Sequence, residues 1–402
     1  MIAIYTLTSA LHDQVVLDET TTEFLSSLDL EYEFKGGEYA DYGTAPLCLI
    51  YVRTGGTEGI FKTLLPRLQS SSSQPFYLLT SGKSNSLAAS MEILSFLQQQ
   101  GLKGEILHGS PMRIRRRIND LVQLSTARQQ LHGQRLGVIG QPSDWLISSQ
   151  ANATALRTKL GINRVDIDIQ EVVEVFNNIS LDSCKLDINP ATKPSPQVAT
   201  ALPDAKRLYY ALRQIVDKYQ LSAFTIRCFD LLTAVHNTGC LALAQLNAEG
   251  IVAGCEGDVP AALSMMMCQA MFGVSGFQAN PSAIDPDTGM MTLAHCTIPL
   301  NMVSSYDLDT HFESGIGVGI RGHMPSGPVT IFKVNGDLTR HFAANGELIG
   351  NKCCSDLCRT QLLIRLDDEQ STNYFLTQPI GNHHIVIPGH CATLLEQWCN
   401  SL

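Results

Sequence analysis

Acidic, carboxamide and imidazole side chains follow one another at the ends of short apolar runs within residues 250–299. In chain order these side chains belong to Glu256, Asp258, Asn280 and His295. Open α/β sheets place their chemistry at strand ends, and a carboxylate and an imidazole at separate strand ends can share a divalent metal. Taken singly, Glu256, Asp258 or His295 is also typical of a helix cap or a surface group. Because such side chains recur at the ends of several apolar runs within one stretch, we predict a metal site there.

The first 133 residues are typical of a small α/β domain. Apolar runs at residues 2–7, 47–52 and 76–80 are each followed by a turn and a helical pattern, which predicts strands alternating with helices. The glycine-rich turns at 54–58 and 81–86 suit a small polar ligand, or are ordinary connections between strand and helix. Neither turn matches G-x-G-x-x-G or the P-loop, so nucleotide binding is not supported.

A second α/β domain is expected over residues 134–295, and we expect the stretch 250–299 to complete its sheet. The other expected strands span residues 136–139, 164–167 and 223–227. Trp145 lies at a junction between strand and helix, where its ring could pack on the C–H face of a sugar or belong to the core. Arg227 ends the last of these strands.

Glycine and period-two alternation dominate from residue 311 to residue 350, which predicts a compact, barrel-like antiparallel domain over residues 296–402. The dipeptides Asn335-Gly336 and Asn345-Gly346 are signals for two-residue hairpin turns.

Four side chains of this third domain are candidates for the site. His311 and Glu313 would share one face of an extended segment, because residues two apart on a strand point the same way. His383 and His384 precede an apolar strand and would point to opposite faces, so at most one of them is expected to reach a given site.

Composition limits the class of protein. A chain of 402 residues is long enough for two or three domains, and an apolar content of 44% can bury sizeable cores. A net charge of −10 without a basic stripe argues against nucleic acid or an anionic membrane as partners. The sequence shows no signal peptide and no membrane span, which makes the cytoplasm the expected location. The 12 cysteines are then read as reduced thiols, and the spacing of Cys354 and Cys358 does not suit zinc.

Five motifs in order, GCEGD, GFQANP, LAHC, HFESG and GNHH, resemble the L-fucose isomerase / L-arabinose isomerase family, in particular its shorter, fucose-isomerase-like members. The resemblance covers most of the chain. It implies two Rossmann-like or flavodoxin-like α/β domains, residues 1–133 and 134–295, followed by a β-rich, barrel-like domain of residues 296–402.

The resemblance also implies a chemistry: aldose–ketose isomerisation of an open-chain sugar through a cis-enediol, with a divalent metal, typically Mn²⁺. Glu256 would be both a ligand and the proton-transfer residue, and Asp258 or Glu313 would take the second proton-transfer role. Asn280 stands where the fucose branch is expected to carry an aspartate. The implied metal ligands are Glu256, Asn280, His295 and His383, with His384 as the less favoured alternative to His383. Candidate contacts to the sugar are Trp145, Arg227, His311, Glu313 and His384.

The resemblance implies a homo-oligomer, a trimer or hexamer, with a small sugar as the partner. Two alternatives stay open. One is an enzyme for a modified sugar, such as a sulfonated or otherwise C6-substituted hexose, with Lys83 or Arg227 facing its anionic group. The other is a sugar-binding protein without catalysis, in which Asn280 marks lost activity.

Overall fold

The structure is a computed structural model that describes residues 2–71 and 74–402. The chain divides into two compact units at residues 129/130, within helix α4, called here the first and second unit. Among the described residues, no helix combines the length and the apolar character that a membrane crossing requires.

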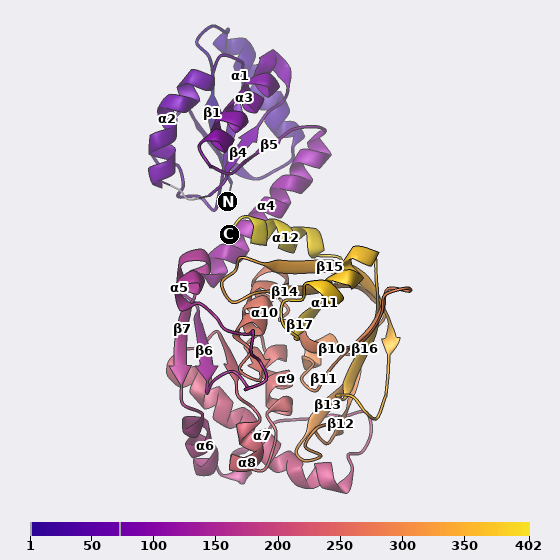
Figure 1. Ribbon diagram of the computed structural model, residues 1–402. Coiled ribbons are helices and arrows are strands. Elements are labelled where there is room, and N and C mark those ends of the chain that lie inside the picture. Colours follow the sequence, from indigo (N-terminus) through magenta and orange to yellow (C-terminus); the bar gives the residue numbers. More distant parts are fainter. Residues whose placement is uncertain (1, 72–73) are drawn as a thin grey trace. The chain divides into compact units, whose positions relative to one another are not determined.

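The first unit contains a parallel sheet, with β1, β4 and β5 labelled in Figure 1. The sheet has five strands in the order β2-β1-β3-β4-β5. Its strands are β1 (Ile2–Leu7), β2 (Tyr32–Gly36), β3 (Leu47–Val52), β4 (Phe76–Leu79) and β5 (Gly104–Leu107). Its helices are α1 (Gln14–Ser27), α2 (Glu58–Ser71), η1 (Lys83–Asn85), α3 (Ser86–Gln99) and α4 (Pro111–Leu131). Every residue of β1 and of β3 is buried, as is typical of parallel strands covered on both faces. The strand order is that of flavodoxin-like sheets.

The second unit begins with a four-stranded parallel sheet in the order β7-β6-β8-β9. Its strands are β6 (Arg135–Ile139), β7 (Asn163–Ile167), β8 (Ala223–Ile226) and β9 (Val252–Cys255). The helical segments around it are α5 (Ala153–Ala155), η2 (Leu156–Leu160), α6 (Ile169–Asn178), η3 (Leu181–Ser183), α7 (Pro196–Tyr219), α8 (Asp230–Ala234) and α9 (Cys240–Ala248).

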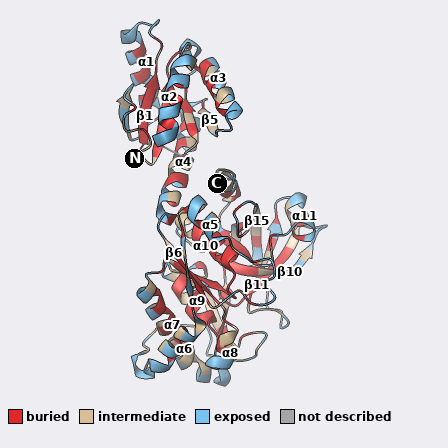
Figure 2. Ribbon diagram, turned by 60° about the vertical axis from the view of Figure 1, so that its left-hand side comes forward, coloured by how far each residue is buried: buried red, intermediate tan, exposed pale blue. Residues whose placement is uncertain are grey.

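Helix α10 (Val259–Phe272) follows β9 and is buried over most of its surface, as Figure 2 shows by its red colour. Asp258 caps its N-terminus by accepting a hydrogen bond from the Ala261 N–H, and Gly273 ends it with a positive φ of 73°. A helix with apolar residues on all sides must pack between two layers. Here it contacts both the parallel sheet and the strands that follow.

Those following strands form a closed antiparallel barrel in the order β10-β11-β16-β15-β14-β17. They are β10 (Phe277–Asp285), β11 (Met290–His295), β14 (Gly327–Val334), β15 (His341–Asn351), β16 (Thr360–Leu366) and β17 (His384–Pro388). Outside the barrel lie η4 (Leu300–Met302), the ribbon of β12 (Ser305–Asp309) and β13 (Gly319–His323), α11 (Glu369–Thr377) and α12 (Ala392–Asn400). Two parallel-sheet α/β parts and a C-terminal barrel confirm the predicted fold class. The boundaries of three separate domains stay a prediction.

The expectation that residues 250–299 complete the second sheet is wrong for their latter part. Only β9 joins that sheet, whereas β10 and β11 pair antiparallel with each other and with β17 and β16. The barrel therefore begins at Phe277, before residue 296. Asn280 also lies inside β10 rather than at a strand end, since that strand continues to Asp285.

Both two-residue hairpin predictions are wrong as well. The turn at Asn335 spans residues 335–340, where the Asn335 side chain accepts hydrogen bonds from the backbone of Thr339 and Arg340. Asn345 lies in the middle of β15, and its side-chain oxygen accepts hydrogen bonds from Thr330 and the Ala392 N–H. The Asn345 side chain therefore connects β15 to β14 and to the start of α12, and it does not form a turn.

Candidate metal centre

Glu256 is the first residue after β9, and its backbone has a positive φ of 63°, which is uncommon for a residue with a side chain. The next residue, Gly257, also has a positive φ, and a Cβ there would lie 2.5 Å from the carbonyl oxygen of Gln141. The Ser143 N–H donates a hydrogen bond of 2.9 Å to the carbonyl oxygen of Glu256. The close packing of this turn on the loop after β6 therefore fixes the position of the Glu256 side chain.

Neighbouring strands of the barrel bring the other candidates to the same place. β10 lies between β17 and β11, and Asn280 of β10 pairs with Ala294 of β11. His295 is the last residue of β11, and His383 directly precedes β17. Asn280, His295 and His383 therefore lie at about the same level of three adjacent strands, although 103 residues separate the first from the last.

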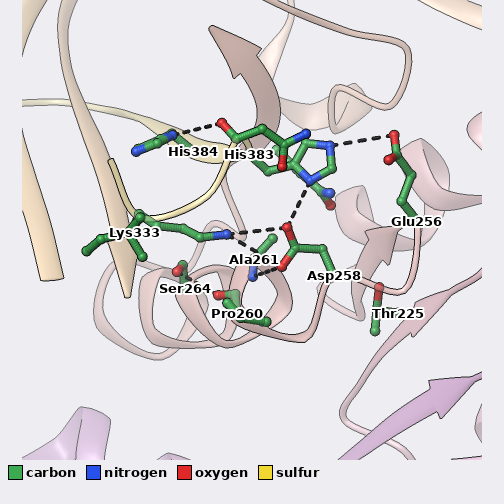
Figure 3. A network of polar contacts seen from close by, with 12 residues as sticks. Thr225, Glu256, Asp258, Pro260, Ala261, Ser264, Lys333, His383 and His384 are labelled. Atoms are coloured by element: carbon green, nitrogen blue, oxygen red, sulfur yellow. Dashed lines mark hydrogen bonds and ion pairs between the residues drawn. The ribbon is translucent and has the colours of Figure 1, made fainter. Parts of the chain in front are cut away.

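Glu256, His295 and His383 form a buried group whose donor atoms all lie within 4.8 Å of one another. The Nε2 atoms of His295 and His383 lie 3.5 and 3.6 Å from Glu256 Oε1. Figure 3 shows the His383 ring between Glu256 on one side and Asp258 on the other. The convergence of these three residues was expected from the sequence.

The donor set fits a divalent metal. His383 Nε2 is completely buried and has no hydrogen-bond partner among the described residues, which is unusual because buried polar atoms are normally paired. Both imidazoles are fixed through their other nitrogen, since His383 Nδ1 donates to Asp258 Oδ2 at 2.9 Å and His295 Nδ1 lies 3.0 Å from Thr297 Oγ1. Such outer contacts orient the metal-binding nitrogens of histidine ligands. One carboxylate and two imidazoles could hold Mn²⁺, Fe²⁺ or Zn²⁺.

Electrostatics keep the carboxylates ionised. Burial alone would raise the pKa of Glu256, but the neighbouring His383 and His295 hold it well below its usual range. Burial opposes ionisation of Asp258 too, and Lys333 together with His383 holds the pKa of that carboxyl low. Burial would lower the pKa of His383, whereas Glu256 and Asp258 raise it to about 9. A divalent cation would take the place of the proton that His383 otherwise carries.

A small cavity adjoins this group, and its volume of about 30 Å³ holds a water-sized guest. Of the residues predicted for the site, those that line it are Glu256, Asn280, His295, His311 and Glu313. The other residues that line the cavity include five cysteines: Cys228, Cys240, Cys255, Cys296 and Cys358. Four of these thiols are buried, as expected for cysteines that act as small apolar residues.

Trp145 contacts the group directly from the loop after β6. Its indole N–H donates a hydrogen bond of 2.6 Å to Glu256 Oε2, and its ring packs edge-on against Phe229. His311 also contacts Phe229 edge-on, and it lies in a turn, not in the extended segment that was expected. The Gly315 N–H donates back to the His311 carbonyl and closes this turn. Burial and the nearby His295 lower the pKa of His311 to about 4.

Asp258 and Arg227 are predicted site residues that do not line the cavity. Asp258 is fully buried behind His383 and caps α10, which corresponds to the capping role that its position also suggested. The guanidinium of Arg227 is engaged by Asp144 and Asp230, and hydrogen bonds to these carboxylates raise its pKa.

His384 points away from the group, as its alternation with His383 requires. Its Nε2 lies 3.0 Å from the Tyr374 hydroxyl, and burial lowers its pKa to about 3. It is therefore not a contact to a ligand in this cavity.

Lys333 and Thr297 contact the candidate ligands or their partners and were missed from the sequence. Lys333 of β14 is 1% exposed, and its Nζ lies 3.4 Å from Asp258 Oδ2. A lone lysine between Phe332 and Val334 in an apolar strand was the available signal, because lysine is almost never buried without a partner. Thr297 follows β11 by two residues and carried no such signal.

The fold and the site together define a protein with parallel α/β sheets, a closed barrel and a buried carboxylate–imidazole group between sheet and barrel. No family model matches the chain. Several proteins named sulfoquinovose isomerase are similar to it. The protein from Clostridium sp. (strain MSTE9) is 24% identical over 225 residues, which are 54% of this chain and 48% of that protein.

The protein of the same name from Alkalicoccus urumqiensis is 21% identical over 269 residues, 62% of this chain and 59% of that protein. The one from Priestia megaterium (strain ATCC 12872 / QMB1551) is 22% identical over 215 residues, 51% and 48% of the two chains. The chain thus spans about half the length of the curated relatives it matches. These similarities relate it loosely to sugar isomerases.

Proposed function

We propose that this chain is a metal-dependent aldose–ketose isomerase that acts on an open-chain sugar through a cis-enediol. The observation that carries the proposal is the buried group of Glu256, His295 and His383 beside a cavity, in which His383 Nε2 has no hydrogen-bond partner in the part of the chain that the structure describes. The names of the similar proteins support the same type of reaction.

A bound divalent ion, Mn²⁺ by resemblance, would polarise the sugar carbonyl and the neighbouring hydroxyl. Glu256, His295 and His383 would hold it, with the Asn280 carboxamide as a further oxygen donor. The two oxygens of Glu256 have separate surroundings, since Oε1 faces the imidazoles and Oε2 meets the Trp145 N–H. One oxygen is thereby suited to ligation and the other to proton transfer.

Glu256 takes the proton from C2 of the aldose and returns it to C1, which converts the aldose through the enediol into the ketose. The hydroxyl proton must also move from O2 to O1. Glu313 is the candidate for this second transfer, because its carboxylate lines the cavity and is exposed. Asp258 is less suited to proton transfer, because its oxygens already contact His383, Lys333 and the Ala261 N–H.

At about 30 Å³ the cavity is smaller than the C1–C2 end of a sugar, so its walls must move apart for a sugar to enter, and the remaining carbons would lie on the exposed side near Glu313. Among the described residues that line it there is no lysine or arginine, and Arg227 is engaged elsewhere. A sulfonate, as in the substrate that the relatives' name states, would need a cation beyond this lining. Neutral and sulfonated sugars are therefore both candidates.

The test combines metal analysis with a substrate panel. Purified protein is analysed for bound metal and then incubated with Mn²⁺ and L-fucose, L-arabinose or sulfoquinovose, and ketose is followed by NMR in D₂O. We expect ketose from at least one sugar, deuterium at C1 of the product, and loss of both on chelation. Ketose formation that survives complete chelation would contradict the proposal, and so would stoichiometric metal without turnover of any aldose.

A further inference from the structure

Lys333 is buried where the barrel meets α10, with 1% of its surface exposed. Its Nζ lies 3.4 and 3.5 Å from the two carboxylate oxygens of Asp258. A buried ammonium is costly, and a buried ion pair stabilises a fold no better than well-packed apolar residues do. The neighbouring positions of β14 are apolar and fully buried, so packing alone gives no reason for a lysine here.

Asp258 connects this lysine to the candidate metal group. Figure 3 shows its carboxylate between Lys333, the Ala261 N–H and the ring of His383. His383 Nδ1 donates to Asp258 Oδ2 at 2.9 Å, which leaves Nε2 of the same ring directed toward Glu256. The chain of contacts therefore runs from the barrel, through the cap of α10, to a candidate ligand.

The direction of the His383 hydrogen bond determines whether the ring can bind a cation. Nε2 offers a lone pair only when Nδ1 carries the ring proton, and a carboxylate at Nδ1 favours that tautomer. Lys333 supplies the positive charge that keeps a fully buried carboxylate in this place. Without it, Asp258 would be a buried anion beside neutral donors and the metal-binding ring.

We propose that Lys333 is a positioning residue of the metal centre: through Asp258 it holds His383 with Nε2 directed at the cation. The inference rests on the proposed function only in taking the Glu256/His295/His383 group as a metal site. It assigns a role to a residue that touches neither metal nor sugar.

The test is a titration of metal-free protein with Mn²⁺, with free Mn²⁺ followed by electron paramagnetic resonance. We expect Lys333→Met to weaken Mn²⁺ binding by about 10- to 100-fold, as is common when an outer partner of a metal ligand is removed. The matched control is Ser264→Ala. Ser264 Oγ accepts a hydrogen bond from the Val334 N–H, so this variant disturbs the same contact between α10 and β14 without touching Asp258. Its Mn²⁺ affinity should stay at the wild-type value.

A double-mutant cycle separates positioning from a structural effect. If Lys333 acts through His383, Lys333→Met should have little further effect on Mn²⁺ binding in a His383→Ala background. An equal fold-change in both backgrounds would overturn the inference. Wild-type Mn²⁺ affinity in Lys333→Met, or equal weakening by Ser264→Ala, would also overturn it.

Should Lys333→Met fail to fold, the double variant Asp258→Asn/Lys333→Met removes both charges and leaves neither unpaired. It should fold and bind Mn²⁺ more weakly than wild type, and undiminished affinity would contradict the inference. These titrations contain no sugar. A protein that shows the expected Lys333 dependence but converts no aldose would reject the isomerase proposal alone.

Discussion

Five ionisable side chains are buried in one contact network: Glu256, Asp258, His295, Lys333 and His383. Charged residues are rarely buried so completely unless they are paired or bind a metal. The shifted pKa values of Glu256 and His383 follow from this mutual contact. Such clustering beside a cavity marks a candidate functional site on physical grounds.

At the residue scale, the first prediction concerns Glu256→Gln. The substitution keeps the size of the side chain but removes its charge and basicity. We expect turnover to fall by about 10²–10⁴, the usual worth of a general base, while the protein stays folded. The control is Glu174→Gln, the same change at an exposed position of α6. Initial rates of ketose formation measure the effect of each substitution. Near-normal rates in Glu256→Gln would exclude Glu256 as the general base.

A second prediction at this scale concerns Asn280→Asp. Asn280 lines the cavity, and its side-chain oxygen accepts a hydrogen bond from Asn382 at 3.0 Å. An aspartate adds a charged oxygen donor at nearly constant volume, and divalent cations prefer charged carboxylates. Mn²⁺ should therefore bind more tightly, as measured by titration of the metal-free variant. Equal or weaker binding would mean that Asn280 is not a metal ligand.

At the scale of elements, the turn after β9 decides where Glu256 points. Two consecutive residues with positive φ, Glu256 and Gly257, bring the chain against the loop of residues 141–145. That loop supplies both the Ser143 N–H and the Trp145 indole N–H to Glu256. Backbone strain of this kind at a candidate site is a feature that the surrounding packing must maintain.

The corresponding prediction is that Gly257→Ala weakens Mn²⁺ binding by at least about tenfold, because a contact of 2.5 Å to the Gln141 carbonyl must be relieved by moving this turn. Gly273→Ala is the matched control. Gly273 has a similar φ of 73° but open space where the added methyl group would lie, so this variant carries only the backbone strain. Both variants should melt lower than wild type, and only Gly257→Ala should lose affinity. Equal Mn²⁺ affinity in the two variants would contradict this.

At the scale of the whole molecule, the candidate metal group joins two parts of the second unit. Glu256 follows the parallel sheet, whereas His295 and His383 belong to the barrel end. The first unit contributes no residue to this group of described side chains. A bound cation should therefore stabilise sheet and barrel together.

We accordingly predict that Mn²⁺ raises the melting temperature of the second unit and leaves that of the first unchanged. A ligand at 100 times its Kd stabilises the folded state by about 2.7 kcal/mol, which corresponds to roughly 5–10 °C for a unit of this size. Calorimetry with Mn²⁺ and with a chelator measures the shift. His383→Ala should reduce the shift, because one ligand is lost, and an undiminished shift in this variant would place the cation elsewhere. The trimer or hexamer implied by the resemblance stays a prediction, and light scattering of the purified protein would measure the mass of the assembly.

Local patterns in the sequence determined much of the fold. Continuous apolar runs followed by turns and helical periodicity are sufficient to predict strands such as β1 and β3, because a parallel strand covered on both faces needs them. The motifs around Glu256, His295 and His383 were sufficient to predict three residues that converge. The alternation of His383 and His384 predicted that the two side chains point to opposite faces, since period two is a local property of a strand, but it did not select between them.

Only the tertiary structure decided which strands pair and which side chains meet across them. The local sequences of β10 and β11 are compatible with either a parallel sheet or an antiparallel barrel. Which sheet they join depends on partner strands far along the chain. The contact between Lys333 and Asp258 spans 75 residues, and that between His383 and Asp258 spans 125. No local periodicity in the sequence predicts contacts between residues that lie so far apart along the chain. The burial that makes Lys333 significant exists only once α10 lies against the closed barrel.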